Sequence, residues 1–214
     1  MRIELPFRTK SGTGEPTMGN ENQQFVDNLH GRYYQAAKEG RVYHSATTPL
    51  GLAIPIYTSV TPLGNVLWNP QGSGVNAVLI SYNAARVSGV EAFGTVGLIY
   101  RKISQSNLAT AAPFSAFAET TPVNGLMGGG VPSACKSSNA GTCTLTAASA
   151  AGDFIRNFFG MLPVIDTSAV ESPVKEITFD GTLILPPGGV IYVAASVASV
   201  ALFAQDWTWE EVPV

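Results

Sequence analysis

The stretch ITFDGTLILPPGGVIYVAASVASVALFAQDWTWEEV, residues 177–212, decides the fold class. Apolar and polar residues alternate at its start and again around Trp207 and Trp209, which is the period-2 pattern of strands with one buried face. Between these runs, the PPGG sequence at 186–189 combines the fixed φ of proline with the positive φ available to glycine, as a tight turn requires. We read three short strands joined by two turns. They predict a closing antiparallel meander, typical of a β-sandwich or jelly roll.

Strand patterns continue upstream of this stretch, from Ser45 onward. Short apolar runs are separated by Gly- and Pro-containing turns at 52–58, 66–68, 77–82, 90–103, 142–147 and 153–164. Together they predict an all-β domain over residues 45–214, a jelly roll or β-sandwich of about eight antiparallel strands. The irregular segment 104–141 is too apolar at Phe114, Phe117, Leu126 and Met127 for a solvated linker. Packing over a neighbouring subunit is a plausible use for it.

Residues 1–44 predict a different organisation, an extended arm followed by one amphipathic helix. In residues 1–19 the apolar residues Ile3, Leu5 and Phe7 alternate, so this segment is either a frayed terminus or an arm that adds a strand to a neighbour. Residues 20–39 predict a helix with Asn20 as its cap and Gly40 as its end. Its apolar stripe consists of Phe25, Leu29, Tyr33 and the alanines at 36 and 37. The stripe would pack either on the protein's own sheet or on a neighbouring molecule.

Charge is scarce in this chain. Charged residues make up 13% of the 214 residues, against about 25% in typical globular proteins. Only nine of them lie between Ser45 and Val170. Either the surface is rich in Ser, Thr, Asn and Gly, or much of it is buried against other subunits. The net charge of -3 argues against a general nucleic-acid-binding protein, which would carry a basic face.

Neither membrane insertion nor metal binding is expected from the sequence. No apolar run approaches the roughly 20 residues of a spanning helix, and the N-terminus lacks the apolar stretch of a signal peptide. We therefore expect a protein made and retained in a cytoplasm. Cys135 and Cys143 are expected to be two reduced thiols rather than a bridge, although a bridge over this short loop would form under oxidising conditions. With no histidine nearby, they do not predict a metal site.

No catalytic pattern is recognisable, so we expect neither an enzyme nor a cofactor. The only histidines are His30, within the predicted helix, and His44, at its end. No nucleophile elbow, paired zinc histidines or phosphate-binding loop is present. Asp206, Glu210 and Glu211 are interpreted as a solvated strand edge.

Two segments resemble structural proteins encoded by tailed bacteriophages. LHGRYYQAAKEGRV, residues 29–42, resembles a helix near the start of those proteins, and LWNPQGSG, residues 67–74, with the strand at 77–82 resembles a turn and strand of the same group. The matches cover about 25 residues and occur in the same order along the chain. Both segments are structural and carry no known catalytic residue.

The resemblance implies a jelly-roll virion protein of the capsid cement or decoration type. Such a protein binds the outer capsid surface, bridges and stabilises major capsid proteins, and forms a homotrimer. We expect the arm and helix to contact the capsid or a neighbouring subunit through Arg2, Phe7, Arg8, Lys10, Phe25, Leu29 and Tyr33. The alternative is a tail or head-fibre module that binds a receptor glycan on an exposed platform of Trp207 and Trp209.

Overall fold

The computed structural model describes the backbone of residues 7–9, 12–14, 17–18 and 24–25, and then residues 31–57, 64–89, 94–102, 114–139, 143–145, 153–161 and 174–214. The chain divides into two compact units, residues 1–35 and residues 36–214.

The described part of the first unit contains two small antiparallel strand pairs. Strand β1 (Phe7–Thr9) pairs with β2 (Gly12–Gly14), and β3 (Thr17–Met18) pairs with β4 (Gln24–Phe25). The prediction of a helix over residues 20–39 is therefore wrong at residues 24–25. Helix α1 spans only Tyr34–Lys38, and the rest of 20–30 lies outside the described residues.

The short helix is bounded by two glycines. The Gly31 carbonyl accepts a hydrogen bond from the Tyr34 N–H at 2.9 Å in the turn that precedes α1. Because glycine costs about 1 kcal/mol in a helix interior, Gly31 disfavours a helix that runs through it. At the other end, Gly40 has a φ of 72° and donates to the Ala37 carbonyl, as predicted for a glycine that ends a helix.

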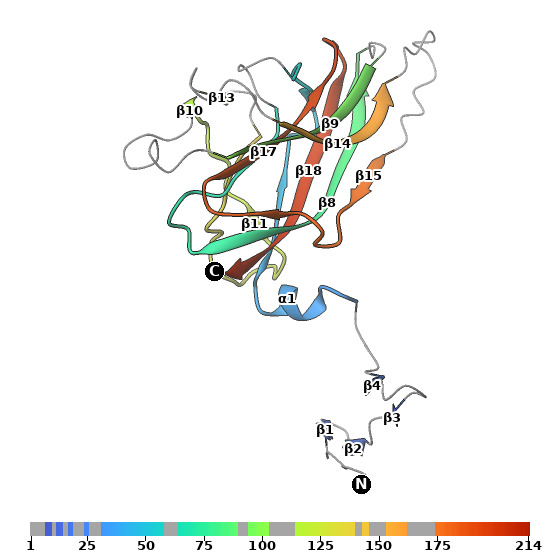
Figure 1. Cartoon of the computed structure of the whole chain (residues 1–214), viewed down its shortest axis with the longest axis vertical. Coiled ribbons are helices and arrows are strands. Elements are labelled where there is room, and N and C mark those ends of the chain that lie inside the picture. Colours follow the sequence, from blue (N-terminus) through green and yellow to red (C-terminus); the bar gives the residue numbers. More distant parts are fainter. Residues whose placement is uncertain are drawn as a thin grey trace. The chain divides into compact units, whose positions relative to one another are not determined.

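The second unit is a sandwich of two antiparallel sheets (Figure 1). The seven-stranded sheet has the order β11–β5–β18–β8–β15, with β6 beside β18 and β16 beside β8. The five-stranded sheet has the order β12–β7–β17–β9–β14. The strands of the first sheet are β5 (Val42–Ala46), β6 (Leu52–Ala53), β8 (Val75–Ser88), β11 (Val123–Asn124), β15 (Lys175–Thr178), β16 (Ile184–Leu185) and β18 (Leu202–Pro213). Those of the second are β7 (Val66–Trp68), β9 (Gly94–Lys102), β12 (Lys136–Ser138), β14 (Asp153–Met161) and β17 (Gly189–Ala195).

The pairing of the eight principal strands is that of a jelly roll. In chain order they are β5, β7, β8, β9, β14, β15, β17 and β18. The first strand, β5, pairs with the last, β18, and the second, β7, pairs with the seventh, β17. The third, β8, pairs with the sixth, β15, and the fourth, β9, pairs with the fifth, β14. This nesting wraps two Greek keys around one core. The predicted all-β jelly-roll sandwich is confirmed, and β5 crosses residue 44, where the sequence placed the end of the N-terminal region.

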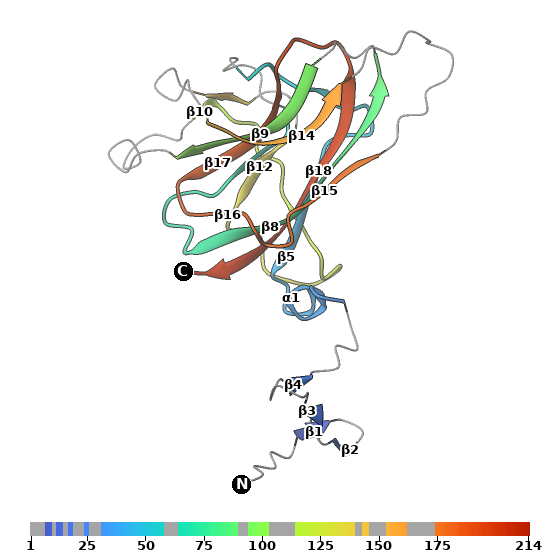
Figure 2. The same ribbon diagram turned by 45° about the vertical axis from the view of Figure 1, so that its right-hand side comes forward.

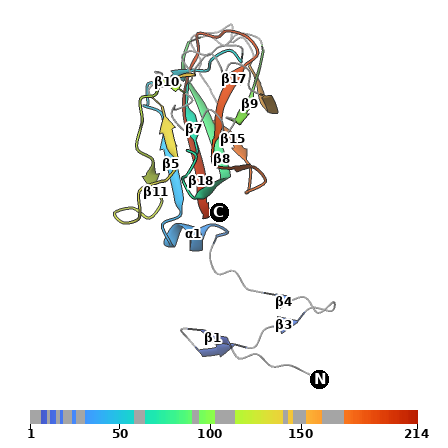
Figure 3. The ribbon, with the colours of Figure 1, turned by 60° about the vertical axis from the view of Figure 1, so that its left-hand side comes forward.

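The predicted closing meander is wrong. Strands β17 and β18 are consecutive but belong to different sheets, so the turn between them crosses the sandwich instead of closing a hairpin (Figure 3). Strand β17 lies between β7 and β9 and is buried along its whole length. Strand β18 lies between β5 and β8, as Figure 2 also shows, and buries alternate residues. The alternation predicted around Trp207 and Trp209 is confirmed.

Aromatic rings form the centre of the core between the two sheets. The Trp207 and Tyr82 rings lie 4.6 Å apart between centroids, and the Tyr82 hydroxyl donates to Gln205 Oε1 at 3.0 Å. The Trp207 indole N–H donates to the Asn65 carbonyl at 3.3 Å. These partners satisfy the polar tips of the two buried rings, as burial requires.

A second apolar cluster lies on the outer face of the five-stranded sheet. A separate two-stranded ribbon, β10 (Phe114–Ala116) paired with β13 (Thr144–Leu145), contributes Phe114 to this cluster. The remaining members are Val66, Ile99, Cys143, Val190, Tyr192 and Ala194. Strand β17 is consequently apolar on both faces, and its sequence reads as a continuous run rather than an alternation.

Candidate functional site

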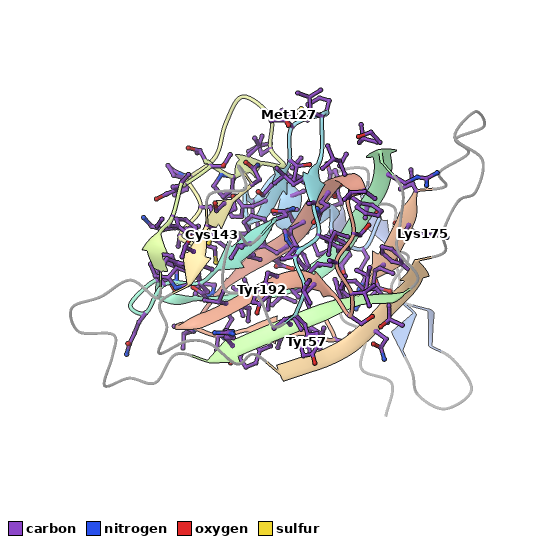
Figure 4. The ribbon with its side chains drawn as sticks, turned by 90° about the horizontal axis from the view of Figure 1, so that it is seen from above. Tyr57, Met127, Cys143, Lys175 and Tyr192 are labelled. Atoms are coloured by element: carbon purple, nitrogen blue, oxygen red, sulfur yellow. The ribbon has the colours of Figure 1, made fainter. Side chains whose placement is uncertain are left out.

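The most distinctive exposed surface of the sandwich is the apolar loop, which we define as residues 123–131, VNGLMGGGV. Four of its side chains are apolar and exposed: Val123, Leu126, Met127 and Val131. Met127 is 87% exposed and lies at the periphery of the domain, whereas Tyr192 lies near its centre (Figure 4). The sequence carries no charge between Glu119 and Lys136. An uncharged surface with several protruding apolar side chains is typical of a protein-binding site.

Asn124 holds the apolar loop against the neighbouring backbone. Its amide nitrogen donates to the Gly40 carbonyl at 2.7 Å and to the Val131 carbonyl at 3.3 Å. Its amide oxygen accepts from the Leu126 N–H at 2.8 Å. The Tyr43 hydroxyl adds a bond of 3.0 Å to the Val131 carbonyl. One asparagine thus closes the loop and ties it to the end of α1.

The glycines of the loop allow this close approach. Gly130 has a φ of 111°, and a Cβ there would lie 2.6 Å from Asn124 Cγ. Any other residue would therefore be strained in backbone conformation and would also clash with the side chain that closes the loop.

Glu211 holds the other end of the apolar loop. This carboxylate is buried and accepts hydrogen bonds from the backbone N–H groups of Ala134 and Cys135, both at 3.0 Å. It also accepts from the Ser133 hydroxyl and, at 3.3 Å, from the Trp209 indole. A buried carboxylate with this set of donors is fully paired, so its role is to fix the chain that follows the loop.

A loop fixed at both ends can bind without first becoming ordered. Ordering a side chain at an interface costs about 0.5–1.5 kcal/mol, and more when the backbone must also be fixed. The apolar loop presents Leu126 and Met127 on a backbone that hydrogen bonds already hold. The arrangement can bind an apolar surface of another protein.

The predicted contact residues of the N-terminal region are only partly placed. Arg2, Lys10 and Leu29 lie outside the described residues, and only the backbone is described for Phe7, Arg8 and Phe25. Tyr33 lies in the turn before α1, half-buried, with the Arg32 guanidinium 5.5 Å from its ring centroid. Because residues 24–25 form a strand, Phe25 and Tyr33 do not share one helical stripe.

The predicted tryptophan platform is wrong. Trp207 and Trp209 are fully buried in the core, and the Trp209 ring stacks on Tyr43 at 6.0 Å between centroids. Neither ring is available on the surface to stack on a sugar. The interpretation of the nearby carboxylates as a strand edge is also wrong, since β18 is an interior strand and Glu211 is buried. Glu210 forms an ion pair with Arg41.

His44 does not end the helix but lies in β5, on the outer face of the seven-stranded sheet. Its Nδ1 is 3.1 Å from the Thr208 hydroxyl. Burial lowers the pKa of His44, against the attraction of Asp206. Burial raises the pKa of Asp206. A 2.9 Å hydrogen bond from Asn83 and the charge of His44 both oppose this rise.

Cys135 and Cys143 are both free thiols in buried positions, as predicted. Burial raises the pKa of Cys143 to about 12. The pKa of Cys135 is raised further, by burial and then by the charge of Glu211. The two thiols also belong to different apolar clusters, one between the sheets and one outside the five-stranded sheet.

The described residues contain no group of three or more His, Cys, Asp or Glu side chains that could hold a metal ion. None of the helices described is long and apolar enough to cross a membrane. Comparison with known protein families finds no matching family model, and neither the curated proteins nor the solved structures include a match.

Proposed function

We propose that this chain is a structural protein of a tailed-bacteriophage virion, of the capsid cement or decoration type. It binds the outer surface of the capsid and bridges neighbouring major capsid proteins. The proposal starts from the resemblance of residues 29–42 and 67–74 to phage structural proteins. A jelly-roll sandwich is the fold that this resemblance implies.

The observation that carries the proposal is the braced apolar loop. A protein that stabilises a capsid must bind the assembled capsid and not its dissociated subunits. A rigid, uncharged loop with Met127 at its tip suits that work, because it contributes apolar contact area at little ordering cost. Scarce charge elsewhere on the chain is consistent with a surface that is covered in the virion.

Self-association is part of the proposal. We propose a homotrimer built through the sandwich, with residues 1–40 contacting the capsid or an adjacent subunit. The basic residues Arg2, Arg8 and Lys10 would then pair with acidic groups of the capsid surface. The glycan-binding alternative loses its only candidate platform, because Trp207 and Trp209 are buried.

Two measurements on purified protein test this function. The solution mass by light scattering should be that of a trimer, and a monomer at all concentrations would contradict the assembly. Deletion of residues 1–19 should abolish binding to empty heads of the encoding phage while circular dichroism still reports a folded β-domain. Unchanged head binding by the deletion variant would rule out the arm as the contact element.

A further inference from the structure

The outer face of the five-stranded sheet carries several polar side chains that are deeply buried. In the sheet register Arg101 lies opposite Val190, which lies opposite Trp68. Tyr192 is two residues after Val190 in β17, and Val66 is two residues before Trp68 in β7. Tyr192 lies opposite Val66, which in turn lies opposite Ser138 of β12. Since alternate residues of a strand share a face, Arg101, Tyr192, Trp68 and Ser138 all belong to the outer face.

None of these four side chains has its polar atoms satisfied among the described residues. The orphaned atoms are Nε, Nη1 and Nη2 of Arg101, Oη of Tyr192, Nε1 of Trp68 and Oγ of Ser138. Arg101 is only 5% exposed, so bulk water has little access to its guanidinium. All four groups donate hydrogen bonds. A buried guanidinium without a partner is rare in native proteins, because removing the charge from water costs free energy that only an anion returns.

Arg101 and Tyr192 are neighbours within this set. Burial raises the pKa of the Tyr192 hydroxyl, and the positive charge of Arg101 opposes that rise. The phenol and the guanidinium therefore lie close enough to interact, and Arg101 acts on Tyr192 both through its charge and as a side-chain hydrogen-bond donor, although their contact does not meet the distance and angle criteria of a hydrogen bond. An anion between them would accept from both.

Few carboxylates follow Arg101 closely in the sequence. Between Arg101 and Asp153 the sequence contains a single acidic residue, Glu119. Its carboxylate is already paired with Lys136 Nζ at 2.8 Å.

The β10–β13 ribbon lies over the same face. Phe114 and Phe117 pack edge-on against Trp68, with ring centroids 5.5 and 5.7 Å apart. The ribbon is a two-stranded sheet of its own, paired with neither large sheet. Displacement of the ribbon would therefore break no strand pairing of either large sheet.

We propose that Arg101 and Tyr192 form a binding site for one carboxylate group beneath the β10–β13 ribbon. A guanidinium binds a carboxylate through two parallel hydrogen bonds, and the Tyr192 hydroxyl donates a third. A single buried positive charge balances a carboxylate but not a doubly charged phosphate. The carboxylate belongs either to a small organic acid or to a second copy of this chain. The site does not depend on the virion role proposed above.

The test uses the full-length protein and acetate as the probe. The melting temperature of the wild type should rise and saturate with sodium acetate at constant ionic strength, and phosphate should have no such effect. Arg101→Met should remove the acetate response, and Tyr192→Phe should weaken acetate binding by about tenfold. Arg156→Met is the matched control. This exposed cation, with its guanidinium 5.5 Å from the Phe179 ring, should respond to acetate like the wild type.

Light scattering distinguishes the two sources of the carboxylate. If a second copy supplies it, Arg101→Met should lower the solution mass and acetate should compete with association. If a small acid supplies it, the mass should be unchanged in the variant. In that second case, Arg101→Met without acetate should be at least as stable as the wild type, because an unpaired buried charge has been removed.

Two results would overturn the site. One is the absence of any saturable acetate response together with an Arg101→Met mass equal to that of the wild type. The other is evidence that Arg101 forms an ion pair within the chain, with Asp153, the first residue of β14. In that case Asp153→Asn and Arg101→Met would each lower the melting temperature, and the double variant would lower it no further.

Discussion

The carboxylate of Glu211, near the end of β18, accepts a hydrogen bond from the hydroxyl of Ser133, which lies 78 positions earlier in the chain. The same carboxylate receives the backbone N–H groups of Ala134 and Cys135. The last strand of the jelly roll therefore holds the segment that follows the apolar loop, and links the rigidity of that loop to the core.

Glu211→Gln should lower the free energy of unfolding by about 2–3 kcal/mol, because an amide nitrogen would face donors in a buried site. Urea unfolding followed by tryptophan fluorescence measures this loss. Glu210→Gln is the matched control. It removes a partly exposed ion pair with Arg41 and should cost at most about 1 kcal/mol. Equal losses in the two variants would contradict the role assigned to Glu211.

Gly130→Ala should destabilise the apolar loop by about 1–3 kcal/mol, since both the positive φ and the Asn124 side chain oppose a Cβ. Gly129→Ala, one residue away, would meet only Leu126 side-chain carbons at 3.6 Å and should change stability by less than about 0.5 kcal/mol. Hydrogen exchange of the Leu126 and Gly129 amides measures the opening of the loop. Similar exchange in both variants would show that Gly130 is not needed to close it.

His44 should make stability depend on pH. Its folded pKa is lowered by burial, so the unfolded chain binds the proton more readily. The contribution of neutral His44 is complete above the ordinary histidine pKa of about 6.5 and is lost as the pH falls below it. His44→Gln should therefore lose less stability than the wild type between pH 7.5 and pH 5. Parallel curves for the two proteins would contradict this prediction.

Both thiols should be inert in the folded protein. Because burial raises the pKa of Cys143 to about 12 and that of Cys135 further, almost no thiolate is present at pH 8. A disulfide reagent such as Ellman's should label neither cysteine in native protein and both in guanidinium chloride. Rapid labelling of one equivalent without denaturant would show that a thiol is accessible.

Local sequence periodicity predicted the strands but not their partners. The run at 66–68 and the alternation around Trp207 and Trp209 correspond to β7 and β18. The meander prediction failed because β18 pairs with β5, more than 150 residues away, and period-2 alternation does not specify a partner. The helix prediction failed at residues 24–25, where the helical spacing of apolar residues competes with a local strand pairing.

The apolar loop could be anticipated in part. Leu126 and Met127, with Phe114 and Phe117, indicated that residues 104–141 are too apolar for a linker. Nothing in the local sequence showed that Asn124 closes the loop. The role of Glu211 had a signal in the sequence. Trp207, Trp209 and Glu211 follow one another at a spacing of two residues, so strand alternation places their side chains on the same face of β18. Because that face is buried at the two tryptophans, Glu211 is expected to be buried as well.

Binding of the full-length protein to empty heads of the encoding phage, measured by co-sedimentation, tests the central claim most directly. The wild type should bind saturably at a fixed ratio to the major capsid protein. Met127→Ser should bind about tenfold more weakly, since burial of this side chain is lost, while Leu50→Ser, a 77% exposed residue outside the loop, should bind as the wild type. Absence of saturable binding by the wild type would contradict the assignment as a capsid cement protein.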